Sequence, residues 1–471
     1  MTGKRWLALY MLCAGELMIV LDTTIVNVAL PSIQADLAFT DATLVWVINA
    51  YMLTYGGFLL LGGRLGDLYG QRRLFLFGVT LFTAASLVCG LSGSQSMLVA
   101  ARAVQGLGGA VVSAIALSLI MNLFSEPADR AKAMGIFSFV CAGGGSVGVL
   151  AGGLLTSVLG WHSVFLVNLP VGAAVYAACV KLLPPDGERA AGRLDVWGAL
   201  TITSSLMLAV YGVVNGNQAG WTSAQTLGLL GAAVVLLAIF LAIEARIAAP
   251  LVPLRLFRVR SVTAANIMGV FWAAAMFAWF FISALYMQLV LGYDPMQIGL
   301  AFLPANLIMA AFSIGWSAKV VMRFGIRLPI VIGMLLSAIG LALFAFAPVD
   351  GSFLLHILPG MLLLGVGCGM ALNPVMLAAM NDVAPSESGL ASGVVNTSFM
   401  MGGALGLAVL ASVAAARTGG VQTAAALTAG YHAAFALAAL FALGAALVSM
   451  LLPRVASPVA GGDNVLAEET R

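Results

Sequence analysis

The chain has 471 residues, of which 62% are hydrophobic and only 8% are charged. A soluble globular domain carries about a quarter charged residues, so this composition excludes a soluble protein and indicates that lipid surrounds much of the chain. The formal net charge of +3 is too small to suggest a nucleic-acid-binding protein.

Continuous apolar runs of membrane-spanning length follow one another along the sequence. Each is about 20 residues long, as a bilayer-spanning helix requires, whereas the strands of a membrane barrel would alternate polar and apolar residues. The first run, residues 6–30, is too long for the core of a signal peptide, so we expect it to be retained as a membrane helix. The predicted fold class is an all-α integral membrane protein with about fourteen spans. They begin near residues 6, 43, 73, 97, 132, 161, 196, 225, 261, 297, 328, 353, 387 and 431.

The distribution of basic residues indicates the orientation. If the N-terminus is cytoplasmic, nineteen of the 21 Lys and Arg residues fall at inner loops and ends, while the outer loops hold only Arg417. The positive-inside rule therefore predicts a multi-pass protein of the plasma (inner) membrane with both termini in the cytoplasm.

A polar linker and an internal repeat suggest the domain organisation. The longest polar interruption is PPDGERAAGRLD at 184–195, and two predicted helices separate it from a basic segment at 246–260. The segment GRLGDLYGQRR (63–73) aligns with AKVVMRFGIRL (318–328), and GIFSFVCAGGGSVG (135–148) aligns with GVVNTSFMMGGALG (393–406). Parallel halves of this kind are typical of one large transporter architecture. The predicted units are a six-helix bundle in 1–183, a linker with two extra helices in 184–260, a second six-helix bundle in 261–453 and a cytoplasmic tail in 454–471.

Three ionisable residues fall inside the predicted spans: Glu16, Asp22 and Arg102. A charge in the bilayer is costly, which makes each of them a candidate functional residue. Asp22 and Arg102 lie at similar depth in the first and fourth helices, so we predict that they pair, with Gln105 joining from one turn further along. The functional interpretation is a carboxylate that takes up and releases protons. The alternative is a static ion pair, which we disfavour because apolar packing can replace such pairs at little cost.

Glu16 precedes Asp22 by six residues and therefore points about 240° away from it around the helix. It is either a second proton-coupling site or a contact for cationic substrates, and the alternative is a protonated carboxyl that is hydrogen-bonded within the bundle. The cysteines show no metal-ligand spacing and no disulfide framework. They are Cys13, Cys89, Cys141, Cys179 and Cys368.

Seven motifs follow one another in a characteristic order. They are LDTTIVNVALP (21–31), GGRLGDLYGQRR (62–73), LVAARAVQGLGGA (98–110), GWHSVFLVNLPVG (160–172), PLVPLRLF (250–257), LGYDPMQIGLAFLP (291–304) and NTSFMMGGALGLAVL (396–410). In this set the chain resembles the major facilitator superfamily, specifically its fourteen-helix drug:proton antiporter branch. The resemblance implies two six-helix bundles plus two inserted helices, and a multidrug efflux function of the kind that confers antibiotic resistance.

The antiporter motif of the fifth helix departs from the branch at one position. The pattern G-x-x-x-G-P-x-x-G-G matches Gly144, Gly148, Gly152 and Gly153, but Val149 stands where proline is expected. A proline would kink the helix, so the departure bears on antiport rather than on the fold.

The segment between the second and third helices is predicted to be a charged, glycine-rich cytoplasmic loop. The resemblance implies that it acts as a latch that closes the cytoplasmic gate, and the alternative is a purely topogenic charge. Asp67 favours the latch, because topogenesis needs no aspartate and the second copy of the motif has Met322 there. The predicted gating residues are Gly63, Arg64, Asp67, Gly70, Arg72 and Arg73.

The candidates for a substrate cavity are Glu16, Gln105, Trp272 and Trp279. Because five aromatic residues crowd one helix at 272–281, several of them are expected to face lipid. We expect the protein to act as a monomer by alternating access, with a small-molecule substrate, protons and membrane lipids as partners and without a cofactor or metal.

The predicted function is therefore the export of amphipathic, cationic drugs or toxic compounds in exchange for protons. Within transport, the alternative is a dedicated exporter of one metabolite, such as an amino acid, a siderophore or a lipid. A different class is a membrane enzyme or receptor. The sequence contains no nucleotide-binding loop of the form G-x-x-x-x-G-K-[ST], and no cluster of His, Cys or paired carboxylates is expected at one membrane face, so ATP drive and catalysis are both disfavoured.

Overall fold

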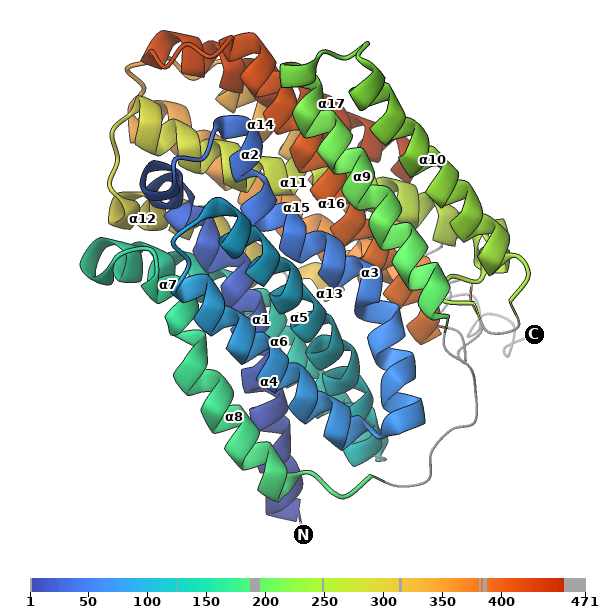
Figure 1. Ribbon diagram of the computed structural model, residues 1–471. Coiled ribbons are helices and arrows are strands. Elements are labelled where there is room, and N and C mark those ends of the chain that lie inside the picture. Colours follow the sequence, from blue (N-terminus) through green and yellow to red (C-terminus); the bar gives the residue numbers. More distant parts are fainter. Residues whose placement is uncertain are drawn as a thin grey trace, which may run out of the picture.

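The computed structural model describes residues 2–124, 126–186, 195–247, 250–312, 316–380, 383 and 388–452. Within these ranges the chain is helical and contains no strand (Figure 1). The helices of 15 residues or more are α1 (Thr2–Leu37), α3 (Trp46–Tyr69), α4 (Gln71–Gly90), α5 (Gln95–Leu123), α6 (Pro127–Leu159), α8 (Asn168–Leu182), α9 (Val196–Ala219), α10 (Ala224–Glu244), α11 (Arg260–Leu285), α12 (Pro295–Ala311), α14 (Arg327–Phe344), α15 (Leu358–Met380), α16 (Ser388–Thr418) and α17 (Ala424–Ser449). Shorter elements are α2 (Asp41–Leu44), α7 (Ser163–Leu166), η1 (Leu254–Arg258), η2 (Tyr286–Val290), α13 (Ser317–Phe324) and η4 (Phe353–Ile357).

The length and hydropathy of these helices confirm the predicted fold class. In the described residues, 11 helices are long and apolar enough to cross a membrane, and shorter apolar helices lie at Val147–Leu159 in α6 and at Pro295–Ala311. With α3 they make up the fourteen helices predicted from the apolar runs. The predicted starts fall close to the observed ones, and the largest differences are seven residues, at 161 against Asn168 and at 431 against Ala424.

The long helices form two groups with an extra pair between them. Helices α1, α3–α6 and α8 pack together, as do α11, α12 and α14–α17, and the groups meet where α6 contacts α12, α3 contacts α16 and α1 contacts α11. Helices α9 and α10 lie side by side at one edge, and α9 packs against α3 and α16 (Figure 1). The linker residues 187–194 and the tail from 453 lie outside the described residues, so the predicted domain boundaries stay a prediction.

Glycines allow α6 to approach its neighbours on two sides. Gly144, Gly148 and Gly152 recur every four residues and face α1, where a Cβ on Gly152 would lie 2.6 Å from the carbonyl oxygen of Ile25. Gly153 faces the other group, where a Cβ would lie 2.8 Å from the carbonyl oxygen of Pro295 in α12. Small residues at such crossings let membrane helices pack backbone to backbone, so α6 joins α1 directly to the second bundle.

The connection between α3 and α4 is a single residue, so the prediction of a loop over 63–73 is wrong. Helix α3 continues to Tyr69 and α4 begins at Gln71, because Gly70 takes a φ of +104° that turns the chain at once. In the second half, Gly325 takes a φ of +75° between α13 and α14, as the internal repeat predicts. The side chains of the gating residues Arg64 and Asp67 lie outside the described residues.

The aromatic residues of α11 lie in the interior, and the expectation that several face lipid is wrong. Trp272, Trp279 and Phe281 expose 2%, 1% and 1% of their surface, and Phe277 and Phe280 are half-buried. The reason is the central position of α11, which packs against α1, α15, α16 and α17 and so offers little surface to lipid.

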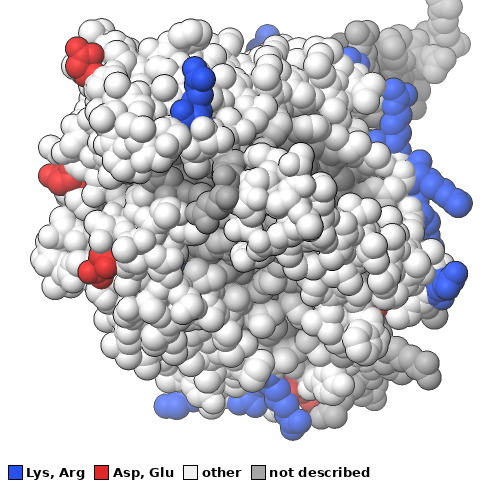
Figure 2. All heavy atoms as spheres, turned by 45° about the horizontal axis from the view of Figure 1, so that its top comes forward, with Lys and Arg blue, Asp and Glu red and all other residues white. Residues whose placement is uncertain are grey.

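Charged side chains concentrate near the ends of the helices. Figure 2 shows Lys and Arg at the top and along the right and lower rims, acidic groups mainly at the left edge, and a broad uncharged surface between them. An uncharged belt with charged rims is the surface that a bilayer-spanning helical protein requires.

Candidate functional site

Asp22 lies at the centre of a buried polar network. Its side chain is 0% exposed and accepts hydrogen bonds from three donors on two other helices. Arg102 of α5 donates from Nη1 to Oδ2, while Gln105 Nε2 and Asn168 Nδ2 donate to Oδ1 over 2.8 and 2.9 Å. The structure therefore brings together Asp22, Arg102 and Gln105, as the sequence predicts, and adds Asn168 from the start of α8.

Arg102 is held independently of Asp22. The side chain is 1% exposed, its Nε donates to the carbonyl oxygen of Val47 over 2.9 Å, and its Nη1 also donates to Gln105 Oε1 over 2.6 Å. The guanidinium carbon lies 4.4 Å from the ring centroid of Tyr51 and 5.6 Å from that of Phe165. These contacts from α3, α5 and α7 stabilise the cation, so the guanidinium has partners even without the carboxylate.

Ser86 of α4 completes the network. Its hydroxyl accepts from Gln105 Nε2 over 2.8 Å and from Asn168 Nδ2 over 3.3 Å, and it donates to the carbonyl oxygen of Phe82 over 2.9 Å. Helices α1, α3, α4, α5 and α8 are thereby linked through one connected set of hydrogen bonds. Such networks stabilise one arrangement of helices, because each member depends on the others.

The network includes residues that sequence reasoning missed. Asn168 stands in the motif GWHSVFLVNLPVG, and an amide within an apolar run is a signal that a search for ionisable residues alone passes over. Ser86 and Tyr51 carry no comparable signal, because Ser and Tyr are common in membrane helices and their rotation toward Asp22 depends on packing.

The chemistry of the site follows from the acceptor count. An ionised carboxylate only accepts hydrogen bonds, whereas a protonated one also donates. The three donors occupy three of the roughly four lone-pair positions of the two carboxylate oxygens, so a proton can add to Oδ2 without displacing a donor. It would remove the negative charge that strengthens these hydrogen bonds, and a protonated Asp22 would therefore hold Arg102 of α5 and Asn168 of α8 less tightly.

Glu16 lies outside this network, as its position on the helix predicts. It is 6% exposed, and the buried hydroxyl of Ser113 in α5 is a polar group that lies beside its carboxyl. The roles of a second proton site and a substrate contact both stay predictions.

The remaining cavity candidates divide between two places. Gln105 belongs to the Asp22 network, whereas Trp272 and Trp279 lie on α11, which contacts α1. The ring centroid of Trp272 lies 5.6 Å from that of Phe399, and Trp279 packs at 5.8 Å from Phe302. A substrate cavity shared by Glu16 and the tryptophans stays a prediction.

The turn at Gly70 is bound by an acid that the sequence analysis did not select. Asp186 Oδ1 accepts from the backbone nitrogen of Arg72 over 2.8 Å, and its Oδ2 lies 3.6 Å from Arg73 Nε. Arg72 Nη2 also donates to the carbonyl oxygen of Val180 over 2.5 Å. The start of α4 is therefore fastened to the end of α8 within the same bundle.

A second pair of buried acids lies between α9 and α10, contrary to the expectation that paired carboxylates are absent. Asp195 caps α9, its Oδ1 accepting from Gly198 N over 2.8 Å, and Glu244 Oε2 accepts from Val252 N over 3.1 Å. The two acids are 2% and 3% exposed, and their other oxygens, both close to Gly198, have no partner among the described residues. The sequence analysis missed the pair because each acid stands at the end of an apolar run.

Comparisons with known proteins agree with this architecture. The profile of the Major Facilitator Superfamily matches residues 12–407. The cephamycin export protein CmcT of Amycolatopsis lactamdurans is 38% identical over 97% of this chain and 94% of its own. The multidrug resistance protein Stp of Mycobacterium tuberculosis is 38% identical over 85% of this chain and 74% of its own.

A solved structure shares the fold at low sequence identity. It is a bacterial homologue of the human lysosomal transporter Spinster in an inward-facing, unoccupied conformation, which matches with a TM-score of 0.66 and 17% identity over 95% of this chain and 98% of that one. The profile match and the two export and resistance proteins confirm the resemblance found in the sequence motifs. The chain therefore belongs to the Major Facilitator Superfamily.

Proposed function

We propose that the protein exports amphipathic, cationic drugs or antibiotics across the cytoplasmic membrane in exchange for protons. The observation that carries the proposal is Asp22, a fully buried carboxylate held by Arg102, Gln105 and Asn168. Intramembrane ionisable residues of transporters mark proton and ion pathways, and the relatives are named for export of and resistance to antibiotics.

Proton uptake at Asp22 is the proposed coupling step. A proton from the outside neutralises the carboxylate and weakens its bond to Arg102. The arginine, on α5, stays bound to α3 through the carbonyl oxygen of Val47 and the ring of Tyr51. Helix α1 is then released from α5 and α8. Release of the proton to the inside restores the network, and substrate binding favours that release.

Helix α6 is the proposed route from α1 to the second bundle. Its glycines pack against α1 on one side of the helix, while Gly153 meets α12 on another. Val149, in the place of the motif proline, is 1% exposed and its carbonyl oxygen lies 3.0 Å from a Cβ built on Gly299 of α12. A shift of α1 would therefore change the contact between the two bundles. The cytoplasmic latch in this proposal is the turn at Gly70 together with Asp67.

The orientation, the domain boundaries and the oligomeric state belong to the same proposal. Nineteen of the 21 basic residues lie on one side if both termini are cytoplasmic, which supports insertion in the inner membrane in that sense. We propose that residues 1–183 and 261–453 are the two moving bundles and that a monomer is the functional unit.

A second candidate function is the export of one particular antibiotic. The relative CmcT, which matches 97% of this chain, is named as a cephamycin export protein. A drug-susceptibility panel in an efflux-deficient host separates the two candidates, because resistance to several unrelated compounds supports multidrug export and resistance to one supports a dedicated exporter.

The test of proton coupling is proton movement in proteoliposomes when the cationic dye ethidium is added. We expect substrate-evoked proton flux in the wild type and none in Asp22→Asn, which mimics the permanently protonated side chain and still binds ethidium. The matched control is Asp350→Asn, which changes an exposed acid in a loop and should behave as wild type. Wild-type proton flux in Asp22→Asn would transfer the coupling role to Glu16, and equal loss in the control would point to a general defect.

A further inference from the structure

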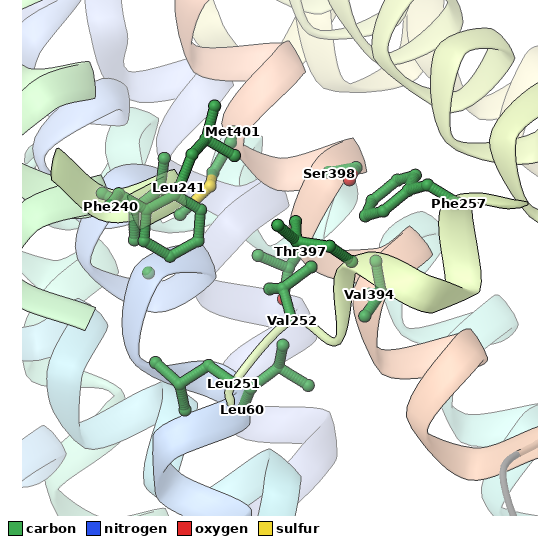
Figure 3. A pocket seen from close by; sticks show the side chains of 13 residues that line it. Leu60, Phe240, Leu241, Leu251, Val252, Phe257, Val394, Thr397, Ser398 and Met401 are labelled. Atoms are coloured by element: carbon green, nitrogen blue, oxygen red, sulfur yellow. The ribbon is translucent and has the colours of Figure 1, made fainter. Parts of the chain in front are cut away.

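The inserted helices help to form an apolar pocket at the seam between the bundles. Its volume is about 170 Å³, comparable to cavities that hold a benzene ring. Figure 3 shows that the labelled side chains around it come from α3, α10, the segment that follows α10, and α16. They include Leu60 of α3, Phe240 and Leu241 of α10, Val252 of the following loop, and Thr397 and Met401 of α16.

The lining is apolar except for two neighbouring hydroxyls. No charged side chain lines the pocket in the described part of the chain. The hydroxyl of Ser398 donates to Asn266 Oδ1 over 2.6 Å, whereas Thr397, which is 8% exposed, has an Oγ1 without a partner there. Among the described residues, Thr397 is therefore the one lining residue with an unpaired polar atom, and the rest of the lining suits a hydrocarbon chain.

The pocket lies at the depth of lipid acyl chains. Leu241 stands three residues before the end of α10 at Glu244, which is about 5 Å along a helix that rises 1.5 Å per residue. Leu241 is also 43% exposed on the outer side of the wall, so the pocket adjoins the hydrocarbon of one leaflet. The molecules that surround this wall in a membrane are acyl chains.

Three exposed arginines lie on the loop and short helix that supply part of the lining. The loop and short helix that supply Leu251, Val252 and Phe257 also carry Arg246, Arg255 and Arg258, all exposed. Cationic residues beside an apolar slot at the membrane interface match the head group and chain of an anionic lipid. This charge pattern separates a phospholipid from a cationic drug, which the same arginines repel.

We propose that this pocket binds one acyl chain of an anionic phospholipid from the cytoplasmic leaflet, with the phosphate at Arg255 and Arg258. The site lies between α3 of the first bundle, α16 of the second and the inserted pair. A bound lipid therefore contacts elements that move apart during alternating access, and Glu244 holds the loop in place through Val252 N. The inserted helices thus serve as a lipid-binding attachment to the two bundles.

Native mass spectrometry of the purified full-length protein tests the site with phosphatidylglycerol and phosphatidylcholine of identical chains. We expect one phosphatidylglycerol to bind at least about ten-fold more tightly than phosphatidylcholine, since each arginine near an anionic group contributes roughly five-fold. The double variant Arg255→Gln/Arg258→Gln should lose this preference, whereas the control Arg323→Gln, an exposed arginine on α13, should keep it.

A pocket-filling variant tests where the chain lies. Val252→Trp should reduce the binding of both lipids about ten-fold or more, and Leu447→Trp, on the exposed surface of α17, should leave it unchanged. If Val252→Trp does not fold, the head-group preference of the arginine variants still decides the proposal. Equal affinity for both lipids in the wild type, or displacement of phosphatidylglycerol by ethidium at one-to-one stoichiometry, would overturn it.

Discussion

Two buried acidic sites in this protein are compensated in opposite ways. Asp22 accepts three side-chain hydrogen bonds, one of them from Arg102. Asp195 and Glu244 each accept a backbone hydrogen bond and lie next to one another with no cation between them in the described residues. Like charges at short distance cannot both ionise freely, while an opposite charge favours ionisation. Burial alone therefore does not determine the role of a carboxylate. Its neighbours determine whether loss of the negative charge destabilises the protein, as at Asp22, or removes a repulsion, as at Glu244.

The largest expected effect is that of Arg102→Ala. It leaves Asp22 buried without its cation, which costs about 3–5 kcal/mol in comparable buried pairs. We expect a large fall in thermal stability in detergent and loss of gradient-driven transport. The control Arg73→Ala removes an arginine that is 73% exposed, and an equally large loss there would show that the Asp22 pair is not exceptional.

Asn168→Ala should have the next largest effect, because it removes a hydrogen bond to the charged carboxylate and another to Ser86. Hydrogen bonds to charged groups contribute about 1.5–3 kcal/mol. The midpoint of thermal unfolding should fall accordingly, while Asn122→Ala, which breaks an exposed bond to Gln71, should hardly move it. Equal midpoints for the two variants would mean that Asn168 adds nothing to the network.

Glu244→Gln should act with the opposite sign. Its amide can donate to the unpartnered oxygen of Asp195 and removes the repulsion, so we expect stability to stay level or rise by about 1 kcal/mol. The gain in stability should grow as pH is raised. At higher pH both carboxyls of the native pair become ionised and repel one another, and the variant lacks this repulsion. Thermal unfolding measured across pH checks this, and a loss of stability as large as that of Arg102→Ala would invalidate the distinction between the two sites.

The smallest effect is expected at the surface pair between Arg73 and Asp186, whose atoms lie 3.6 Å apart. Arg73 is 73% exposed, whereas Asp186 is 11% exposed. Because solvent and salt screen the exposed partner, Arg73→Gln should change stability by less than about 0.5 kcal/mol. The comparison with Asp186→Ala sharpens the point, because that change also removes the bond to the backbone of Arg72. It should therefore destabilise the turn more than Arg73→Gln does.

The sequence was informative where a residue type is rare in its surroundings. Ionisable residues are costly in lipid, so Asp22 and Arg102 stand out in the sequence as functional candidates. Their similar depth in the membrane predicts the ion pair that the structure contains. Asn168 and Ser86 were not predictable, because polar uncharged residues are frequent in membrane helices and only helix rotation decides which face inward. The pair of Asp195 and Glu244 escaped for a related reason: at helix ends a charge is ordinary, and only tertiary packing buries it.

The turn between α3 and α4 shows the limit of motif reading. The glycine and charged residues of segment 63–73 predict a loop, yet α3 continues through this segment as far as Tyr69. Helix ends depend on where a backbone reversal is possible, and Gly70 alone takes the positive φ that ends α3.

The network around Asp22 also has a consequence for membrane insertion, because its members are synthesised at different times. Arg102 follows Asp22 by 80 residues, and Asn168 follows it by 146. At a synthesis rate of about 5–20 residues per second, the first helix waits roughly 4 to 16 seconds for its cationic partner and longer for the amide. During that interval the insertion machinery must shelter a lone carboxyl from lipid. Ribosome pausing or slow codons between these positions would therefore prolong the exposure of the first helix, and the yield of inserted protein becomes sensitive to translation speed.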